Sequence, residues 1–469
     1  MTSTGTTTSA NRRRRIVILG GGFGGAYCAQ ALNRARRRFD ADVTLIDRHN
    51  YFVFFPLLVE AGTGGLEPRH AVVPIRDFTG TLEFIMAEVR AVDTAGGTVT
   101  ARLVGGDEDV VIHYDHLVLS LGSITRLPSN VPGVRDLAWQ MKGLSDAVAL
   151  RDRAIELLER ANATADPEAR RALLRFVVVG GNFTGVEVAG EFDHFLKAAA
   201  KRFPRLLPRD CQVCLIEIDE RILRPLGGDL SDFALRHLRR RGVDVRLETT
   251  VRAIGPDHVV LSTGERLDAN CVIWCAGIEP NPLIASIDVP VDERGYILCE
   301  RDLRVRGFEN IWAIGDSAVN INAAGHAYPA TAQHAVRQGA HCARNLIAAL
   351  AGRSTTPCDL QDLGSLAALG CRTGVARVFG IRLSGFWAWW LWRTVYLLKM
   401  PRLARKVRIA LDWTIDLLFS RDYVQLGVHR TAARDAARGD GPDAGEHSDA
   451  ASRPNGPARG EIAAGSSRP

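Results

Sequence analysis

Several features that would assign this 469-residue chain to a class at once are missing. The Ser- and Thr-rich start lacks the apolar core of a signal peptide, so secretion is not expected. The apolar share of 46% is ordinary for a globular protein, which argues against a polytopic membrane protein. A net charge of +6 is small for this length and gives no reason to expect nucleic-acid binding. We therefore expect two or three globular domains in a reducing compartment.

Cysteine is also missing where redox chemistry would need it. The nine cysteines form no regular ladder, and none lies between Cys28 and Cys211. Cys211 and Cys214 fall in a strand-like run, where alternation sends their side chains to opposite faces of a sheet. Such cysteines usually act as small buried hydrophobic residues. No second pair at zinc spacing is present, so no metal site is predicted.

The most informative feature that is present is a glycine-rich turn that occurs twice, about 160 residues apart. The apolar run 16–19 leads into a turn at 20–25, and the run 176–179 leads into a turn at 180–185. Each turn opens a helical pattern, the context in which such a turn holds a dinucleotide pyrophosphate on a helix N-terminus. Two such turns predict two dinucleotides, and hence a flavoprotein that takes hydride from a nicotinamide.

The first turn carries the complete set of residues that this chemistry needs. Gly20 permits the tight turn, Gly22 lets the backbone approach phosphate oxygens, and Gly25 lets the helix pack on the strand. Asp47 follows the next strand, where a carboxylate accepts hydrogen bonds from a ribose.

The second turn departs from this set at one position. Asn182 replaces the central glycine, and Asn is the non-glycine residue most tolerant of left-handed geometry. Its side chain would crowd a pyrophosphate or donate to it, and a degenerate domain that no longer binds nucleotide is the alternative. Glu217 at the ribose position favours NADH, while Arg221 and Arg224 keep NADPH open.

A third motif follows the two turns. Gly315-Asp316 ends an apolar run and places a carboxylate for a ribityl hydroxyl. The segment 329–335 then predicts a helix start with Pro329 in the first turn. A helix N-terminus aimed at a flavin ring would stabilise the negative charge of the reduced flavin.

The order of these motifs resembles the two-dinucleotide flavoproteins of glutathione-reductase-like fold and, within them, the type II NADH:quinone dehydrogenases. The stretches that carry the resemblance are 20–25, 47–58, 184–191, 312–316, 331–334 and the tryptophan-rich segment near 383–418. The resemblance implies an α/β fold with two doubly wound, Rossmann-like domains. The implied parts are a disordered leader (1–13), an FAD domain split between 14–126 and 280–350, a linker helix with an NADH domain (143–279), a C-terminal membrane-docking region (364–424) and a disordered tail (429–469).

The same resemblance implies roles for individual residues. FAD would be held by Gly20, Gly22, Gly25, Asp47, Val89 and Asp316. NADH would be held by Gly180, Gly181 and Glu217. Further cofactor contacts are expected at Phe23, Gly24, Gly122, Thr184, Gly277, Gly315 and Ala332. Glu187 matches a family glutamate near the flavin–nicotinamide stack, where it would orient the nicotinamide or help to deliver a proton to quinone. The alternative is that it only complements the dipole of its helix.

Two positions depart from the family pattern. In much of the family two glutamines at helical spacing lie beside the quinone, whereas here Gln333 is followed four residues later by Arg337, with Gln338 next to it. A family lysine near the flavin aligns with Arg372, which keeps the charge but changes the donor geometry. Gln333, Arg337 and Arg372 are therefore candidate catalytic residues beside Glu187, and the electron acceptor stays open.

The C-terminal region supplies the membrane argument. The apolar run 386–398 contains Arg393 and is too short and interrupted to span a bilayer. Cations follow it, and a second amphipathic stretch covers 409–419. Tryptophan at an interface with cations toward headgroups predicts a helix pair lying on the membrane through residues 386–419. A buried homodimer interface is the alternative, because Trp and Arg are also enriched there.

The expected function is electron transfer from NADH through FAD to a quinone in the bilayer, at the cytoplasmic face of the cell membrane and without proton pumping. Two other functions stay open: a soluble NAD(P)H-dependent reductase of a ferredoxin- or rubredoxin-type carrier, and a membrane-bound flavin redox sensor with little turnover. Disulfide reductases and sulfide:quinone reductases need cysteines in the interval where this chain has none.

Overall fold

The computed structural model describes residues 13–427. The predicted leader, apart from Arg13, and the predicted tail lie outside these residues. Seven strands form the first sheet, in the order β20-β8-β1-β2-β5-β6-β7. The first five of that order run parallel, and β6 and β7 are antiparallel additions at one edge. The strands are β1 (Arg14–Leu19), β2 (Ala41–Asp47), β5 (Glu83–Asp93), β6 (Thr98–Leu103), β7 (Asp109–His113), β8 (His116–Leu119) and β20 (Ile311–Ala313).

A second, fully parallel sheet of five strands has the order β10-β17-β11-β12-β13. Its strands are β10 (Ala138–Trp139), β11 (Arg175–Val179), β12 (Gln212–Ile216), β13 (Asp244–Arg246) and β17 (Cys271–Trp274). All of them precede β20 in the chain, so the first sheet is completed only after the second has been built. The predicted fold class, with one doubly wound domain inserted into another, is confirmed.

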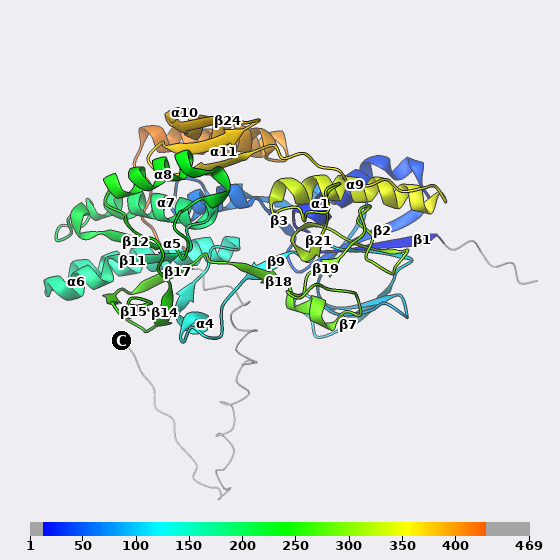
Figure 1. Cartoon of the computed structure of the whole chain (residues 1–469), viewed down its shortest axis with the longest axis horizontal. Coiled ribbons are helices and arrows are strands. Elements are labelled where there is room, and N and C mark those ends of the chain that lie inside the picture. Colours follow the sequence, from blue (N-terminus) through cyan, green and yellow to red (C-terminus); the bar gives the residue numbers. More distant parts are fainter. Residues whose placement is uncertain (1–12, 428–469) are drawn as a thin grey trace, which may run out of the picture. The chain divides into compact units, whose positions relative to one another are not determined.

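The two sheets are joined by an antiparallel ribbon of β9 (Ser123–Thr125) and β18 (Ile278–Pro280), which lies between them in Figure 1. Long helices cover the sheets because each has one apolar face. Helices α1 (Phe23–Ala35) and α9 (Ala332–Leu350) lie side by side on the first sheet (Figure 1). The second sheet is accompanied by α5 (Leu144–Ala163), α6 (Pro167–Leu173), α7 (Phe183–Ala200) and α8 (Gly228–Arg240).

Shorter elements complete the described residues. The helices among them are α2 (Leu58–Gly62), α3 (Arg76–Thr79) and α4 (Val134–Leu137). The strands are β3 (Tyr51–Val53), β4 (Val72–Pro74), β14 (Val251–Ile254), β15 (His258–Leu261), β16 (Arg266–Asp268), β19 (Ile297–Leu298) and β21 (Ala318–Val319). Cys211 and Cys214 are buried in different apolar clusters, Cys211 with the helices that cover one face of the second sheet. The prediction that they point to opposite faces is therefore confirmed.

The C-terminal region is a hairpin sheet followed by two helices. It consists of β22 (Ser365–Ala368), β23 (Gly374–Val378), β24 (Ile381–Gly385), α10 (Phe386–Lys399) and α11 (Leu403–Leu418). The hairpin packs on α7 and α8 of the second domain. Helix α11 begins at Leu403, six residues before the predicted second stretch. Within residues 13–427, no helix combines the length and the apolar character needed to cross a bilayer.

Gly339 fixes the close approach of α9 to α1 and gives a test of this packing. A Cβ at position 339 would overlap the Gly24 carbonyl oxygen and lie 3.0 Å from the Cys28 amide nitrogen. We expect Gly339→Ala to lower the free energy of unfolding by about 2 kcal/mol or more, because backbone must move apart. Gly106→Ala, whose new Cβ would meet nothing closer than 4.0 Å, should change it by less than about 0.5 kcal/mol. Equal effects in thermal or urea unfolding would refute close helix packing as the reason for this glycine.

Candidate active site

The first glycine turn is held by backbone contacts that need glycine at two positions. Gly20 has a φ of +97°, and its amide donates to the Ile46 carbonyl at 2.8 Å. A Cβ on Gly25 would overlap the Gly20 carbonyl oxygen, whereas a Cβ on Gly22 would meet no atom within 4 Å. The turn is therefore tight on its protein side and open at Gly22, the position predicted to face phosphate.

The second turn repeats this geometry. Gly180 has a φ of +107° and donates to the Ile216 carbonyl at 2.7 Å, and a Cβ on Gly185 would overlap the Gly180 carbonyl oxygen. In both turns a carboxylate from the next strand binds the second glycine. The Gly21 amide donates to Asp47 Oδ2 at 2.6 Å, and the Gly181 amide donates to Glu217 Oε2. Asp47 and Glu217, the two predicted ribose ligands, therefore also stabilise the turns beside them through these hydrogen bonds.

Asn182 does not use the left-handed geometry that its residue type tolerates. Its φ is −74°, and it is the N-cap of α7. Its Oδ1 accepts from the Gly185 amide at 3.0 Å, and its Nδ2 donates to the Cys275 carbonyl at 2.7 Å. The side chain is engaged by the turn itself, as expected of an N-cap that satisfies an orphan amide. It stabilises the turn without using the φ freedom of a glycine.

The ends of β8 and β20 flank the first turn on the side away from β2. A Cβ on Gly24 would lie 2.7 Å from Ser120 Oγ and 3.1 Å from an Ile314 side-chain carbon. Asp316 follows closely in the chain, and its Oδ2 accepts from the Ser123 hydroxyl at 3.2 Å. Gly122 and Gly315 both have positive φ, as sharp turns after strands require. The structure therefore groups these predicted FAD contacts around the first turn.

Glu187 is half-buried where α7 meets the C-terminal region. Its Oε1 accepts from the Ala368 amide at 3.1 Å and from Trp392 Nε1 at 3.2 Å. Burial raises the pKa of Glu187 to about 8, against which the two hydrogen bonds act only partly. The protonated form of the carboxyl is therefore favoured at neutral pH, and both hydrogen bonds are accepted by Oε1. Glu187 lies beyond the first turn of α7, which contains no acidic residue. The interaction of a charge with the helix dipole falls off beyond the first turn, so this position favours the electrostatic alternative less.

A buried ionic network lies next to Glu187 and was not predicted from the sequence. Glu60 on α2 accepts from Trp413 Nε1 at 2.7 Å and from Arg393 at 3.3 Å. Arg393 stacks over the rings of Trp389 and Trp413 at 4.4 and 4.6 Å. Arg421 extends the network by binding Asp416 at 2.8 Å and Glu191 at 3.4 Å. These contacts join α2 and α7 to both C-terminal helices. A charge inside the apolar run, as at Arg393, was the one sequence signal for this network.

The predicted acceptor residues on α9 face the segment 361–364. Gln333 Nε2 donates to Asp362 at 3.2 Å, and Arg337 donates to the Gln361 carbonyl at 2.7 Å. Arg337 Nη2 is buried and has no hydrogen-bond partner among residues 13–427. Gln338 instead points inward, where its Oε1 accepts from the Gly315 amide at 2.8 Å. Gln333 and Arg337 therefore share a helix face, and Gln338 supports the turn before Asp316.

Two details of the α9 and hairpin predictions are corrected by the structure. The helix begins at Ala332 with Thr331 as N-cap, so Pro329 precedes its first turn. Arg372 is exposed in the turn between β22 and β23, with a φ of +57°. Its neighbour Cys371 contacts His194 at 3.1 Å, about two helical turns beyond Glu187. The structure thus does not bring Arg372 to the side chain of Glu187.

The remaining predicted cofactor contacts are distributed as follows. Phe23 opens α1 and packs against Phe52 at 4.8 Å, and Val89 is half-buried in β5. Thr184 is exposed near the N-terminus of α7, and Gly277 has a φ of +77° after β17. The nine cysteines, all in the described part, are free thiols. Residues 13–427 contain no group of three or more His, Cys, Asp or Glu side chains arranged for a metal ion.

The fold and the paired turns define a two-dinucleotide pyridine-nucleotide flavoprotein, and the comparisons agree. Residues 14–339 match the family described as pyridine nucleotide-disulphide oxidoreductase. Residues 363–422 match the NDH2 C-terminal domain. The chain is 21% identical to the structure of NDH2 from Plasmodium falciparum in complex with NADH, with a TM-score of 0.80 over 88% of this chain and 100% of that one. That likeness supports the fold.

Curated relatives place the chain more narrowly. It is 30% identical to a type II NADH:quinone oxidoreductase of Mycobacterium tuberculosis, over 85% of this chain and 87% of that protein. It is 34% identical to a demethylphylloquinone reductase of Synechocystis, over 83% and 93% of the two chains. The chain belongs to the type II NADH:quinone oxidoreductase family, which confirms the family that its motifs resemble.

The protonated state of Glu187 can be tested through stability. Its pKa of about 8 in the folded chain exceeds the ordinary 4.5, so the folded state binds a proton that the unfolded chain releases between these values. The contribution of Glu187 to the free energy of unfolding is fully present below about pH 4.5 and is lost as the pH rises through about 8. The loss is at most about 1.4 kcal/mol per pH unit. Urea unfolding at pH 5.5, 7 and 8.5 should show that the free energy of unfolding of Glu187→Gln rises relative to that of the wild type as pH rises. Glu159→Gln, at an exposed glutamate, should show the same pH dependence of the free energy of unfolding as the wild type. An unchanged difference between Glu187→Gln and wild type across pH would contradict the assignment.

Proposed function

We propose that this chain is an NADH:quinone oxidoreductase that transfers electrons from NADH through FAD to a quinone. The observation that carries the proposal is the pair of matched glycine turns, each braced by its own carboxylate. FAD fits the first turn, where Gly22 is open and Asp316 stands beside it. NADH fits the second, beside Glu217. When bound, FAD accepts hydride from NADH and passes two electrons on to the quinone.

Glu187 fits a proton-handling role in this reaction. Reduction of a quinone to a quinol requires two protons, one supplied with the hydride of NADH and one from the surroundings. The carboxyl of Glu187 holds a proton at neutral pH because burial raises its pKa to about 8. Trp392 and Ala368 fix Oε1, which leaves Oε2 as the proton-bearing oxygen. We propose that Glu187 orients the nicotinamide or supplies a proton on the quinone side.

The acceptor side is proposed at α9. The buried Nη2 of Arg337, without a partner in residues 13–427, is a donor suited to a carbonyl oxygen such as that of a quinone. Gln333, one turn earlier on the same face, offers a second amide group. These residues support a quinone over a protein carrier, since a buried donor is out of reach of a docked protein. Arg372, in the exposed hairpin turn, is retained only as a more remote candidate.

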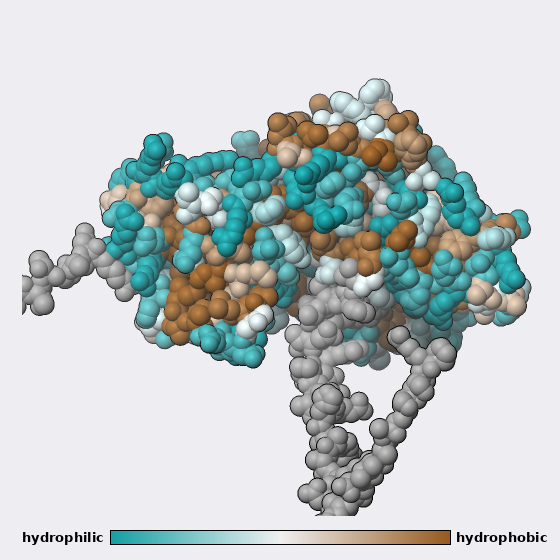
Figure 2. All heavy atoms as spheres, turned by 180° about the vertical axis from the view of Figure 1, so that it is seen from behind, coloured by the Kyte–Doolittle hydropathy of each residue, from teal (hydrophilic) through white to brown (hydrophobic). Residues whose placement is uncertain are grey.

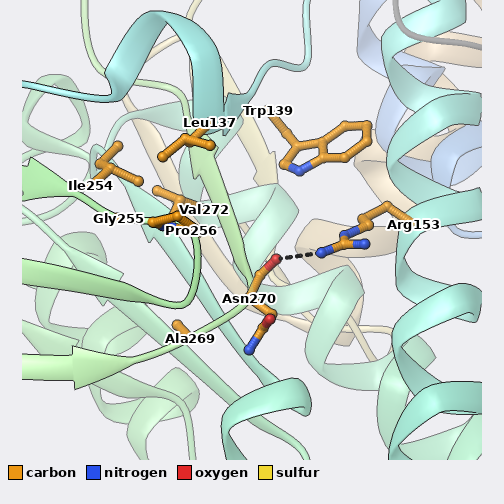
Figure 3. A pocket seen from close by; sticks show the side chains of 9 residues that line it. All are labelled: Leu137, Trp139, Arg153, Ile254, Gly255, Pro256, Ala269, Asn270 and Val272. Carbon is orange, nitrogen blue, oxygen red and sulfur yellow. Dashed lines mark hydrogen bonds between the residues drawn. The ribbon is translucent and has the colours of Figure 1, made fainter.

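We further propose that α10 and α11 dock on a membrane surface. Exposed apolar residues recur on α11 at Leu403, Val407, Leu411 and Ile415, one helical turn apart, and exposed Phe419 follows the helix directly. On α10, Phe386, Trp387 and Trp390 are also exposed. Figure 2 shows apolar surface gathered over the C-terminal region. A continuous apolar stripe of this length on a monomer indicates an interaction surface. A peripheral position at the cytoplasmic face of the cell membrane would give a lipid-soluble quinone access to the site. The alternative to test is that another copy of the chain covers this apolar surface.

Anaerobic flavin spectroscopy tests the electron path. We expect NADH to bleach the flavin absorbance of the detergent-extracted full chain, and a short-chain quinone to restore it. Arg337→Met should slow the quinone step at least about 10-fold, the loss of one charge-assisted hydrogen bond, and leave bleaching by NADH intact. Bleaching without reoxidation by any quinone would favour a carrier-protein reductase. Bound FAD that NADH does not bleach would favour the redox sensor, with Asn182 closing the second turn.

The docking surface is tested by vesicle flotation. The double variant Leu411→Asp/Ile415→Asp should lose binding to phospholipid vesicles, because two charges would enter the apolar layer. Val111→Asp, at an apolar residue of β7 that is 60% exposed, is the matched control and should bind like wild type. Sedimentation of the same proteins without lipid shows whether the chain forms a dimer through this apolar surface. A dimer that the double variant abolishes, together with unchanged flotation, would replace the membrane by a second copy of the chain.

A further inference from the structure

Lys142 is a half-buried cation beside the first dinucleotide turn that the proposed reaction does not yet use. It lies between β10 and α5, on the linker that leads into the second domain. Its side chain nevertheless reaches back to the first domain, where Nζ donates to Ser123 Oγ at 3.2 Å. The same hydroxyl donates to Asp316 Oδ2 at 3.2 Å. Lys142, Ser123 and Asp316 therefore form one hydrogen-bonded chain.

The ammonium group is only partly satisfied. An ammonium has three donors, and within the described range the structure gives Nζ one hydrogen-bond acceptor, the Ser123 hydroxyl. A second contact is with the ring of Phe55, whose centroid lies 5.8 Å away. Burial lowers the pKa of Lys142, and the Asp316 carboxylate offsets this in part. The Asp146 carboxylate accepts hydrogen bonds from the backbone amides of Lys142 and Gly143, which holds the Lys142 backbone in place. The half-buried ammonium group is therefore positioned for a further acceptor.

The strand order shows which part of a dinucleotide lies there. Asp47, the predicted ribose ligand of the adenosine side, follows β2 on one side of β1. Ser123 and Asp316 follow β8 and β20 on the other side. A dinucleotide whose pyrophosphate rests over β1 must therefore extend its flavin half toward Lys142. Phe55 also lies 6.2 Å from Phe23, the first residue of α1, which keeps Lys142 close to the turn.

Charge balance indicates the acceptor. A pyrophosphate carries two negative charges at neutral pH, and Asp316 would add a third on the flavin side. A cation within reach of both offsets this repulsion, and a charge-assisted hydrogen bond to phosphate is among the strongest that a lysine makes. Resting on the proposed binding of FAD at the first turn, we propose that Lys142 is a further FAD ligand, whose ammonium binds the flavin-side phosphate and closes the site from the linker.

The test is flavin binding to the full-length apoprotein, followed by quenching of flavin fluorescence. Lys142→Met should raise the dissociation constant of FAD about 10- to 100-fold, the loss of one charge-assisted hydrogen bond. Lys142→Arg should recover most of the affinity, because it keeps the charge. Lys201→Met, at an exposed lysine just after α7, controls for the loss of one positive charge and should bind FAD like wild type.

Truncated flavins locate the contact. FMN keeps the flavin-side phosphate and riboflavin has none, so Lys142→Met should weaken FMN by about the same factor as FAD and leave riboflavin unchanged. Equal weakening of riboflavin would overturn the proposal in favour of a contact with the flavin ring. Wild-type affinity of Lys142→Met for both FAD and FMN would also overturn it. If the wild-type chain itself binds no FAD, the proposed function fails, which is a separate outcome.

Discussion

The carboxylate of Glu60 is the contact on which the arrangement of the site depends. It is almost fully buried, and it receives Trp413 from α11 and Arg393 from α10. Removing a buried ion from water is costly, and a buried pair that loses one partner typically destabilises a protein by about 3–5 kcal/mol. The two C-terminal helices can therefore lie on α2 only in the register that presents both donors. That register also brings Trp392 to Glu187.

Excess acid in this region explains why protons are retained there. Glu60, Glu191 and Asp416 pair with two arginines, Arg393 and Arg421, and Glu187 lies close enough to this network to feel the charges of Glu60 and Glu191. Burial raises the pKa of both Glu60 and Glu187. The Glu60 and Glu191 carboxylates raise the pKa of Glu187 further, and the Glu191 carboxylate raises that of Glu60. Like charges in a low-dielectric site disfavour one another's ionisation, which adds to the effect of burial on Glu187. The same packing that docks the helices thus sets the proton affinity of the proposed proton donor.

The sequence predicts what depends on local patterns and misses what depends on long-range contacts. The glycines, Asp47 and Glu217 were found because turn geometry and strand ends leave a fixed spacing in the chain. The Glu60 network was missed because its members are separated by more than 300 residues and one of them, Arg393, looks like an interruption of an apolar run. The N-cap role of Asn182 was not predicted, since N-cap and left-handed positions favour the same residue type. Arg372 was placed by alignment with a family lysine, and a hairpin turn with two consecutive positive-φ residues carries it to the surface instead.

The charges of the last two helices are sorted by side, and this bears on how the enzyme would approach a membrane. Asp412 binds His70 at 2.5 Å and Asp416 binds Arg421, so both acids of the segment 386–419 are turned toward the protein. Arg393 is turned inward with them. The other cations of the segment, at 399, 402, 405, 406 and 408, lie from the end of α10 to the second turn of α11. Several of these cations reach back to backbone carbonyls of the protein, as Arg405 does to Arg69 and Lys406 to Leu398. A surface that turns its acids inward and keeps its cations near an apolar stripe matches an apolar layer next to negatively charged groups. This charge arrangement supports the proposed docking of the helix pair on a membrane, the environment that would also dissolve the quinone.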